Sequence, residues 1–403
     1  MQKFRTAAFV YKQNGVKGIF QIIQEKQRKL IRTFSPYKIK FLVKNEDVIN
    51  CDWDNSKKEF KTNKKSGPYI FNWVMSPPGK GSGGHQNIFR FISFLEEAGH
   101  TCRIYLYTSG IMPSLEVVNK NISSGYTKVN AQIKFLEGEM EQADAIFATG
   151  WETAYPVYNQ QSPVKRFYFI QDYEPYFYTI GSEFALAENT YKFGFTGITA
   201  GKWLTQKLTT EYSMNCDFYD FGVDSGSYMN LNHATRKKVF FYARPVTSRR
   251  GFELGILALE KFHNENPDIE IVMAGWDVSD FDVPFPFVNL GVCHINDLPE
   301  IYNECAAALI LSFSNLSLLP LELLSCGVIP VLNKGLNNEL VSDNEYIKYC
   351  EPTPGSLSKA LSDIVNNDAQ VDLALKASES VRMCTWEDAG KKFLEIIEKE
   401  IHE

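Results

Sequence analysis

Several features that mark special classes of protein are missing from this 403-residue sequence. Its eight cysteines are spread singly, with no CxxC pair and no Cys/His cluster at zinc-ligand spacing, so a disulfide framework or a zinc site is not expected. No stretch approaches the roughly 18 to 20 apolar residues of a membrane span, and the N-terminus lacks the features of a signal peptide. The 26 glycines and 17 prolines are too few for a collagen-like or low-complexity chain. We therefore expect a globular protein kept in the cytosol.

Charge is present but unevenly distributed. The net charge is −6, yet residues 1–65 hold 16 Lys/Arg and 6 Asp/Glu, a local charge of +10. Within them Val16, Ile19, Phe20 and Ile23 recur at helical spacing with basic residues between, which predicts a basic amphipathic helix. Such a helix either lies on an anionic membrane surface or packs on the body of the protein with its basic face in solvent.

The rest of the chain alternates short apolar runs with helix-length amphipathic segments. Continuous apolar runs are typical of strands buried on both faces of a parallel sheet. Two series are expected, the first at 69–75, 101–107, 145–150, 166–172 and 193–199, the second at 238–244, 269–275, 307–312 and 328–333. The pattern predicts an α/β fold of two doubly wound, Rossmann-like domains that face a central cleft.

The predicted division of the chain follows from these series. Residues 1–65 form a basic N-terminal extension, residues 66–220 the first domain and residues 221–385 the second domain. Residues 386–403 form a C-terminal amphipathic helix, and Thr385 has the chemistry of a helix start.

A glycine-rich loop follows the first expected strand and leads into a helix, in the sequence SPPGKGSGGHQ (76–86). Gly83 and Gly84 allow backbone amides to approach an anion at the helix N-terminus. The loop is neither a P-loop nor a dinucleotide fingerprint, and a tight strand-to-helix turn explains it equally well. His85 follows the glycines, although a single loop histidine is usually just solvated.

Arginines follow the first strand of the second series. Arg244 ends a buried strand, and Arg249 and Arg250 precede Gly251 at the start of a long helix. Arginine is the preferred partner of phosphate oxygens, and a strand end places it at the ligand edge of a parallel sheet. We favour a ligand contact for Arg244 and a surface salt bridge for Arg249.

A third pattern lies at residues 312–333, where a strand ends, a polar loop follows and Pro320 opens a helix. Glu322, in the first turn, is well placed to accept hydrogen bonds from ribose hydroxyl groups, while the loop with Ser314, Ser317 and Leu318 can meet phosphate. Alternatively, Glu322 simply complements the helix dipole.

Acidic and aromatic residues follow the buried strand at 166–172. Asp172 and Glu174 are candidates for contact with an acceptor sugar or a reacting hydroxyl, and Tyr173 belongs to an aromatic cluster suited to sugar stacking, although such clusters are more often core. Two AspXAsp motifs, at 52–54 and 280–282, lie in loops away from strand ends. We therefore expect no metal site.

The order of these features resembles the GT-B glycosyltransferases of family 4. The resemblance depends on the Gly-Gly loop, FGVD (221–224), AR…RRG, LGVCHINDLPEIY (290–302) and LPLELLSCGVIPV. Within that family the sequence is most similar to WsaF-like bacterial rhamnosyltransferases, through SPPGKGSGGHQNIFRF and FIQDYEPYFY.

The resemblance assigns roles to individual residues. It implies that Arg244 and Arg250 hold the donor diphosphate and that Glu322 binds the ribose. Val292 lies near the base in this scheme, and Gly83 and Gly84 pack close to the phosphates or the donor sugar. Ser314 stands where the family has a glutamate, which puts the contact of that glutamate with the donor sugar in doubt.

The resulting hypothesis is a retaining, metal-independent glycosyltransferase. The resemblance implies transfer of L-rhamnose from dTDP-L-rhamnose to a hydroxyl of a bacterial surface polysaccharide such as O-antigen, capsule or S-layer glycan. Arg244, Arg250 and Asp172 are its expected catalytic residues; His85, Tyr173 and Glu174 are expected to bind a lipid-linked oligosaccharide acceptor. We expect a cytoplasmic protein, peripheral on the inner face of the membrane through residues 1–65, with no nucleic-acid partner. A non-catalytic binder of nucleotide sugars or glycans and a nucleotide-sugar epimerase are the alternatives.

Overall fold

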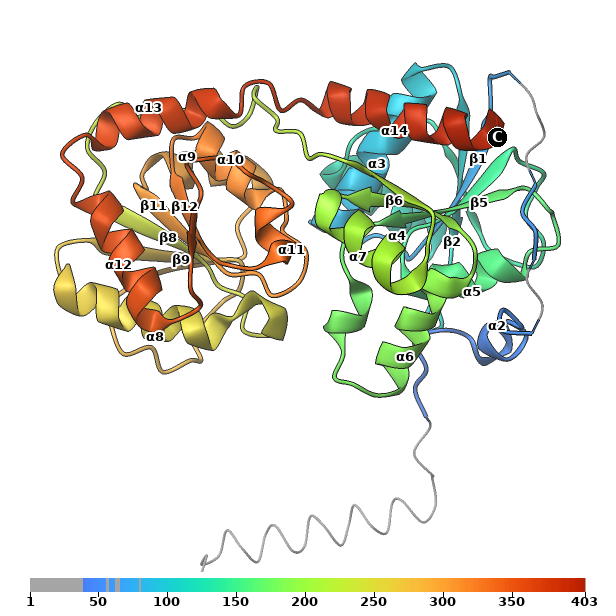
Figure 1. Ribbon diagram of the computed structural model, residues 1–403, viewed down its shortest axis with the longest axis horizontal. Helices are drawn as coiled ribbons and strands as arrows, with labels where there is room; N and C mark the ends of the chain where they lie inside the picture. The colour runs from blue at the N-terminus through green and yellow to red at the C-terminus, as the bar shows by residue number, and fades with distance from the viewer. Residues whose placement is uncertain (1–38, 56–57, 62–65, 80, 403) are drawn as a thin grey trace, which may run out of the picture. The chain divides into compact units, whose positions relative to one another are not determined.

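The computed structural model describes residues 39–55, 58–61, 66–79 and 81–402 (Figure 1). The amphipathic helix expected around residues 16–32 lies outside the described residues. Val43–Glu403 form one compact unit, which contains both sheets. None of the helices in the described part of the chain is long and apolar enough to cross a bilayer.

The first sheet has seven parallel strands in the order β3-β2-β1-β4-β5-β6-β7. Its strands are β1 (Ile70–Met75), β2 (Thr101–Leu106), β3 (Gln132–Phe135), β4 (Ala145–Ala148), β5 (Lys165–Ile170), β6 (Thr196–Ala200) and β7 (Cys216–Tyr219). Successive strands run outward in one direction from β1 and in the other from β4. The topological switch point therefore lies between β1 and β4, where parallel sheets bind ligands beyond their carboxyl ends.

Helices connect the strands of the first sheet on both of its faces. They are α3 (Gly83–Glu97), α4 (Leu115–Gly125), α5 (Trp151–Asn159), α6 (Ser182–Asn189) and α7 (Lys202–Tyr212). Because crossovers between parallel strands are right-handed, the reversal at the switch point puts α3 and α4 on one face and α5 and α7 on the other.

Aromatic side chains fill the core of the first sheet. The rings of Trp73 on β1 and Phe147 on β4 are stacked, with centroids 4.2 Å apart. Phe91 on α3 stacks on Phe393 of the last helix, α14 (Trp386–His402), at 4.4 Å. The C-terminal helix thus packs beside α3, far from it in sequence (Figure 1).

The second sheet has six parallel strands in the order β10-β9-β8-β11-β12-β13, with its switch point between β8 and β11. Its strands are β8 (Lys238–Tyr242), β9 (Glu270–Ala274), β10 (Val288–Gly291), β11 (Ala307–Ile310), β12 (Ile329–Asn333) and β13 (Lys348–Cys350). Its helices are α8 (Phe252–Glu265), α9 (Leu298–Asn303), α10 (Leu319–Ser325), α11 (Leu336–Glu339), α12 (Pro354–Val365) and α13 (Gln370–Ser380). Helices α8 and α12 lie side by side over one face (Figure 1).

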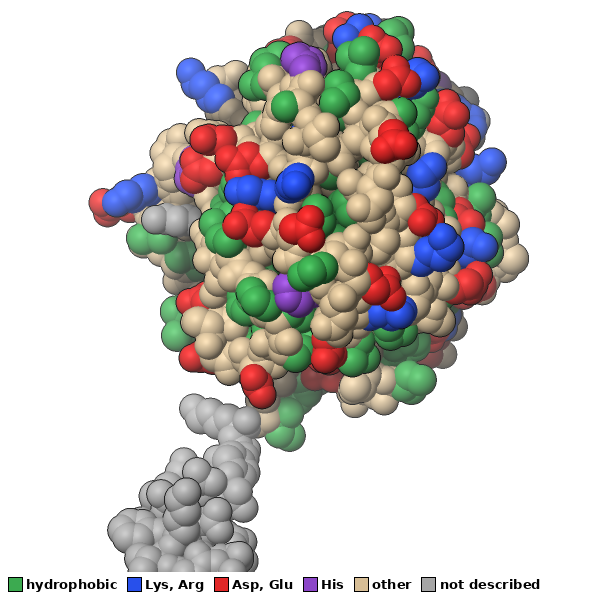
Figure 2. All heavy atoms as spheres, turned by 90° about the vertical axis from the view of Figure 1, so that its left-hand side faces the viewer, with side chains coloured by type: hydrophobic (Ala, Val, Ile, Leu, Met, Phe, Trp, Pro, Cys, Tyr) green, Lys and Arg blue, Asp and Glu red, His purple; other side chains and the backbone are tan. Residues whose placement is uncertain are grey.

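Charges of both signs are mixed on the outer face that Figure 2 draws. Helices of the second domain carry ion pairs one turn apart, such as Lys359–Asp363 and Lys376–Asp372, both at 2.8 Å. The face in Figure 2 therefore presents no continuous basic surface of the kind that binds nucleic acid.

The predicted fold, two doubly wound parallel sheets, is confirmed. Nine strands coincide with the apolar runs, whereas β3, β7, β10 and β13 were not anticipated. These four form the edges of the two sheets, and most of their residues are only half-buried or exposed. An edge strand has a single strand neighbour and needs no continuous apolar run, which explains why hydrophobicity alone misses it.

Part of the region expected to be an N-terminal extension packs on the first domain. Helix α2 (Asn45–Ile49) lies against α5. The hydroxyl of Tyr107 donates to Asp47 Oδ2 at 2.6 Å, and Lys58 Nζ donates to the carbonyl of Tyr158 at 2.8 Å. Residues 44–58, where described, therefore belong to the folded body.

Candidate functional site

The motifs noted in the sequence gather at the two switch points. The glycine-rich loop follows β1 and leads into α3, while Arg244 follows β8 and Ser312 follows β11. Asp172 follows β5, one strand beyond the first switch point. Topology thus brings segments that are far apart in sequence to the ligand-binding edges of the two sheets.

Three arginines cluster at the switch point of the second sheet. Arg244 Nη1 donates to the carbonyl of Gly275 at 3.3 Å, and Arg250 Nη1 donates to Ser312 Oγ at 2.9 Å. Burial lowers the pKa of Arg249; the carboxylate of Asp172 opposes this, and the positive charges of Arg250 and Arg244 lower it further. The three guanidinium groups are therefore close enough to repel one another, an arrangement that an anion would relieve.

The turn that carries these arginines depends on a glycine. Gly251 has a φ of +57°, in the left-handed region, and a Cβ there would lie 2.7 Å from the ring of Phe313. Only glycine fits this close approach without strain. Arg249 and Arg250 are thereby held in a short 3-10 turn (Ser248–Arg250) directly before α8.

Asparagines fix the loop after β11. Asn333 exchanges two hydrogen bonds with the backbone of Ser312, both at 2.8 Å. Asn338 Nδ2 donates to the same Ser312 carbonyl at 3.0 Å, and Asn337 Nδ2 donates to the carbonyls of Ser312 and Ser314. The polar loop expected to meet phosphate is therefore a fixed structure.

Asp172 connects the loops of the two sheets. Its Oδ1 accepts from the backbone N–H of Asn315 at 2.8 Å, its Oδ2 accepts from Ser314 Oγ at 3.0 Å, and Arg249 Nε lies 3.5 Å from Oδ2. Asn315 Nδ2 also donates to the carbonyls of Gln171 and Ala200. The structure thus brings Asp172 and Ser314 together. Arg249, for which a surface salt bridge was expected, forms an ion pair with Asp172 and so links the arginine cluster to this carboxylate.

The glycine-rich loop places two amides at the start of α3. Gly83 and Gly84 are exposed, and the first N–H groups of a helix have no partner within it. Gly84 is held through its carbonyl, which accepts from Gln171 Nε2 at 3.0 Å. These amides are available to an anion or a sugar oxygen.

His85 is engaged in this loop. Its Nε2 lies 3.0 Å from the carbonyl of Ser76, and its Nδ1 lies 2.9 Å from Ser82 Oγ. Burial lowers its pKa, so the ring is neutral at pH 7; Nε2 then carries the proton because a carbonyl oxygen only accepts. Both ring nitrogens are therefore already used.

Glu322 is nearly buried on α10, with 9% of its surface exposed. Burial raises its pKa to about 7, against the opposing positive charge of Arg90 on α3. The other predicted donor contacts are more open: Val292, just beyond β10, is 77% exposed, and Ser317 and Leu318 are half-buried directly before α10.

Tyr173 and Glu174, expected to face an acceptor, are buried. Glu174 Oε2 accepts from the backbone N–H of Trp151 at 2.6 Å and from the Tyr168 hydroxyl at 2.8 Å. Burial, with the negative charge of Glu152, raises the pKa of Glu174 to about 8. The exposed rings of the same loop belong to Tyr176 and Phe177. In this structure those rings, and not Glu174, are accessible from solvent.

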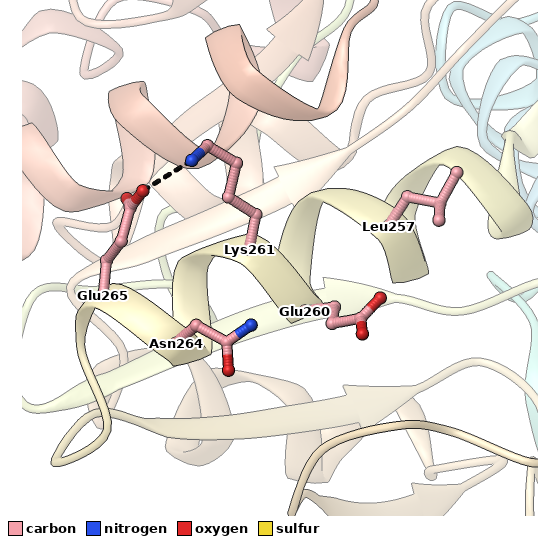
Figure 3. Close-up of a pocket in the computed structure, with 5 residues that line it drawn as sticks. All are labelled: Leu257, Glu260, Lys261, Asn264 and Glu265. Carbon is pink, nitrogen blue, oxygen red and sulfur yellow. Dashed lines mark hydrogen bonds and ion pairs between the residues drawn. The ribbon is translucent and has the colours of Figure 1, made fainter.

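Two hollows elsewhere do not coincide with this constellation. One, of about 240 Å³, lies along the outer side of α8 and is lined by Leu257, Glu260, Lys261, Asn264 and Glu265 (Figure 3). Lys261 and Glu265, one helical turn apart, form an ordinary surface ion pair there at 2.7 Å (Figure 3). The other includes Lys238 and Glu270 at the first residues of β8 and β9, which is the amino edge of the sheet.

No metal-ligating cluster is found among the described residues. The aspartates of the motifs at 52–54 and 280–282 are exposed loop residues, as expected for solvated acids.

Parts of the chain are similar to known proteins. A model described as the C-terminal domain of WsaF matches residues 237–362, and one described as the WsaF N-terminal domain matches residues 129–200. Parts of both domains of this chain are thus similar to WsaF. An O-antigen biosynthesis protein, RfbC of Myxococcus xanthus, is 36% identical over 253 residues, which is 60% of this chain and 20% of RfbC. The chain thus spans about a fifth of the length of that relative.

Solved structures show the GT-B fold of this WsaF-like chain. Anabaena HepE, in complex with UDP and glucose, has a TM-score of 0.64 at 12% identity and covers 82% of this chain and 100% of its own. A glycosyltransferase from Rickettsia africae has a TM-score of 0.57 at 14% identity, covering 83% of this chain and 99% of its own. At these identities the likeness concerns the fold alone.

Sequence reasoning missed several residues of the candidate site. Asn315, Asn333, Asn337 and Asn338 organise the loop after β11, and the positive charge of Arg90 on α3 opposes the rise in the pKa of Glu322. Three of the asparagines lie in the LNKGLNNE segment at and after the end of β12, where polar residues next to a sheet edge were the available signal. No sequence signal marked Arg90, because an arginine inside an amphipathic helix is ordinary.

Proposed function

We propose that this chain is a glycosyltransferase that transfers a sugar from a nucleoside diphosphate donor to a hydroxyl of a bacterial surface polysaccharide. The observation that carries the proposal is the cluster of Arg244, Arg249 and Arg250 at the switch point of the second sheet, facing the carboxylate of Asp172. A diphosphate brings the negative charge that such a cluster lacks. Both WsaF domain matches and the O-antigen protein RfbC support this reading.

The finer proposal is that the donor is dTDP-L-rhamnose and that the anomeric configuration is retained. Arg244 and Arg250 bind the diphosphate, and the amides of Gly83 and Gly84 face it from the first domain. Val292 contacts the base, and Glu322 binds the ribose ring of the nucleotide. Ser317 and Leu318 add donor contacts at the start of α10. HepE, a structural neighbour, was solved with UDP-glucose, so UDP donors are the first alternative.

The chemistry requires stabilisation of a departing diphosphate and of a positively charged sugar centre. Two arginines with helix-terminal amides stabilise the diphosphate. In a front-face reaction the leaving phosphate oxygen takes the proton of the acceptor hydroxyl, so no separate base is needed. Asp172 then serves the reaction through Arg249, Ser314 and Asn315, which its carboxylate holds in place.

We place the acceptor, a lipid-linked oligosaccharide, over the carboxyl edge of the first sheet. Tyr176 and Phe177 are exposed there and suit sugar stacking. The buried side chains of Tyr173 and Glu174 stabilise the loop that carries these exposed rings, and His85 stabilises the glycine-rich loop.

A thermal-shift screen tests the donor. The protein is heated with dTDP, UDP, GDP or ADP, each with EDTA and with Mg²⁺, since a ligand at about 100 times its Kd stabilises by about 2.7 kcal/mol. Stabilisation by dTDP that does not require metal is expected. A larger rise in melting temperature with UDP indicates a UDP-sugar donor instead of dTDP-L-rhamnose. No rise with any nucleotide contradicts the proposal.

Product analysis then distinguishes the remaining functions. Incubation with the matching nucleotide sugar and a polysaccharide acceptor is expected to yield a glycosylated product. An epimerised nucleotide sugar formed without acceptor indicates an epimerase, and binding without transfer or slow hydrolysis indicates a non-catalytic protein.

Membrane attachment through the basic segment is a separate proposal. Because residues 44–58, where described, pack on the first domain, we expect the contact to come from the residues before them. Full-length protein with Lys26, Arg28, Lys29 and Arg32 all changed to Gln is expected to sediment less with anionic vesicles than the unchanged protein. Equal sedimentation contradicts the proposal.

A further inference from the structure

The two exposed rings of the loop after β5 have partners in different domains. Tyr176 and Phe177 belong to a short 3-10 turn (Glu174–Phe177) and are 42% and 38% exposed. Tyr176 packs edge-on against Tyr173 of its own loop, with ring centroids 4.6 Å apart. The guanidinium of Arg249, which belongs to the second domain, lies 3.9 Å from the centroid of the Phe177 ring. The charged partner of Phe177 therefore comes from the opposite domain.

The turn that carries both rings is fixed from inside the first domain. Glu174 Oε2 accepts from the backbone N–H of Trp151 at 2.6 Å, and the hydroxyl of Tyr178 accepts from Trp151 Nε1 at 2.9 Å. These contacts hold the chain directly before and after the two exposed rings. They do not determine the side-chain torsions of Phe177, which has several staggered rotamers open to it. A partner on one face of its ring is needed to select one of them.

Arg249 is well fixed to act as that partner. Its carbonyl oxygen accepts from the backbone N–H of Phe313 at 2.9 Å, which ties its backbone to the loop after β11. Its Nε lies 3.5 Å from Asp172 Oδ2, and its side chain is only 25% exposed. Arginine stacks its planar guanidinium on an aromatic face, which the compact ammonium group of lysine does not reproduce. Arg249 is thus a rigid support for the Phe177 ring.

We propose that Arg249 is a positioning residue for the acceptor: from the second domain it holds the Phe177 ring in the orientation on which a sugar of the acceptor stacks. This inference rests on the proposed function, in which the loop after β5 binds the acceptor. Arg249 covers one face of the ring, so the opposite face is left for the apolar face of a sugar. Acceptor affinity then depends on the residue directly before Arg250, in the domain that binds the donor.

Transfer kinetics test the inference, with octyl α-L-rhamnopyranoside and octyl β-D-glucopyranoside as probes for a lipid-linked sugar. The donor, dTDP-L-rhamnose or UDP-glucose, is kept saturating for every variant, so that a weaker diphosphate site does not alter the comparison. Arg249→Met is expected to raise the KM for the acceptor about fivefold, the size of one cation–π contact. Phe177→Leu is expected to raise this KM at least as much, because it removes the ring itself.

A double-mutant cycle shows whether Arg249 acts through the ring. In a protein that already carries Phe177→Leu, Arg249→Met is expected to change the acceptor KM by less than about 1.5-fold, because the ring that it positions is gone. Tyr176→Leu provides the matched control. Tyr176 has its ring partner in its own loop, so the effects of Tyr176→Leu and Arg249→Met are expected to multiply.

Two further measurements separate positioning from other losses. Arg249→Lys keeps a positive charge beside Asp172 but loses the planar stack, so kcat is expected to recover while the acceptor KM stays raised. A 4-fluorophenylalanine placed at position 177 gives a single fluorine resonance. This resonance is expected to shift on Arg249→Met, and in the wild-type background on addition of the octyl glycoside. Circular dichroism and the melting temperature show whether each variant is folded.

The outcomes distinguish this inference from the function on which it rests. A wild type that transfers a sugar to neither octyl glycoside contradicts both the lipid-linked acceptor and the inference. If the wild type transfers sugar, three results overturn the inference alone. They are an acceptor KM that Arg249→Met leaves unchanged, an equal effect of Arg249→Met with and without the Phe177 ring, and a fluorine resonance that does not respond to Arg249→Met.

Discussion

The carboxyl edge of the second sheet presents arginines, whereas that of the first presents carboxylates and aromatic rings. Arg244, Arg249 and Arg250 surround the switch point of the second sheet. At the first sheet, Asp172 follows β5 and the buried Glu174 lies behind the exposed rings of its loop. The same topology therefore supports two chemistries, one suited to a diphosphate and one to a hydroxyl-rich ligand.

The difference also shows in how each edge tolerates its charge. The arginines repel one another and have Asp172 as their acidic partner, so the second edge is prepared for an anion. At the first edge burial disfavours the ionised form of two carboxyl groups: it raises the pKa of Glu174 to about 8 and also raises that of Glu152. The ion pair between Asp172 and Arg249 joins the two edges directly.

Removing the arginines is expected to have the largest effect. Arg244→Ala with Arg250→Ala should weaken binding of a nucleoside diphosphate by about 100-fold or more, since a hydrogen bond to a charged group contributes about 1.5–3 kcal/mol. Calorimetric titration measures it. The matched control is Arg103→Ala on β2, outside the candidate site, which is expected to bind normally. A loss below about tenfold would contradict a diphosphate site here.

Installing a glutamate at position 314 is expected to be damaging. Ser314 is fully buried and its Oγ lies 3.0 Å from Asp172 Oδ2, so Ser314→Glu forces two carboxylates together. We expect the free energy of unfolding to fall by roughly 3 to 5 kcal/mol, as for other unpaired buried charges. Adding Asp172→Asn should restore part of the loss, as chemical denaturation would show. Unchanged stability in the single variant would mean that the two loops separate freely.

Glu174 provides a prediction about pH. Its pKa is raised to about 8 in the folded protein from an ordinary value near 4.5, so it ionises more readily when unfolded. The wild type therefore loses stability as pH rises from about 4.5 to about 8. Glu174→Gln lacks this titration and should melt below the wild type at pH 5 but match or exceed it at pH 8.5.

An exposed carboxylate supplies the control for that comparison. Glu387, whose side chain is 70% exposed, is expected to give no such crossover when changed to Gln. Melting curves of Glu174→Gln that stay parallel to those of the wild type would show that Glu174 is ionised in the folded protein.

The smallest effect is expected at Ser314 itself. Ser314→Ala removes one hydrogen bond to Asp172 but leaves the bond from the Asn315 N–H and the ion pair with Arg249. The expected loss is about 1 kcal/mol of stability and a few-fold in turnover, measured by denaturation and by an assay of sugar transfer. A loss as large as that of the double arginine variant would make Ser314 a direct donor contact.

The fold was predictable from the sequence because buried parallel strands are recognisable as continuous apolar runs. Runs such as residues 145–150 and 307–312 are apolar throughout, and their order identifies two doubly wound sheets. The edge strands β3 and β13 escaped because a partly exposed strand needs no such run.

The candidate site was predictable only where a residue directly ends a strand. Arg244 and Ser312 fall at the switch point because β8 and β11 end there. Burial was not predictable: Tyr173 and Glu174 occupy the same loop as exposed rings, and only tertiary packing decides which side chains point inward. The contact of Asp172 with Asn315, 143 residues away, likewise follows from how the two sheets are brought together.

The most direct measurement compares the affinities of a nucleoside, its monophosphate and its diphosphate for the wild type and for the Arg244→Ala, Arg250→Ala protein. Thymidine, dTMP and dTDP form one series, and uridine, UMP and UDP the other. We expect affinity to rise steeply with each phosphate in the wild type and this gain to be lost in the variant. Affinity that does not depend on the phosphates, or that survives removal of both arginines, would contradict a diphosphate-binding site at the second sheet.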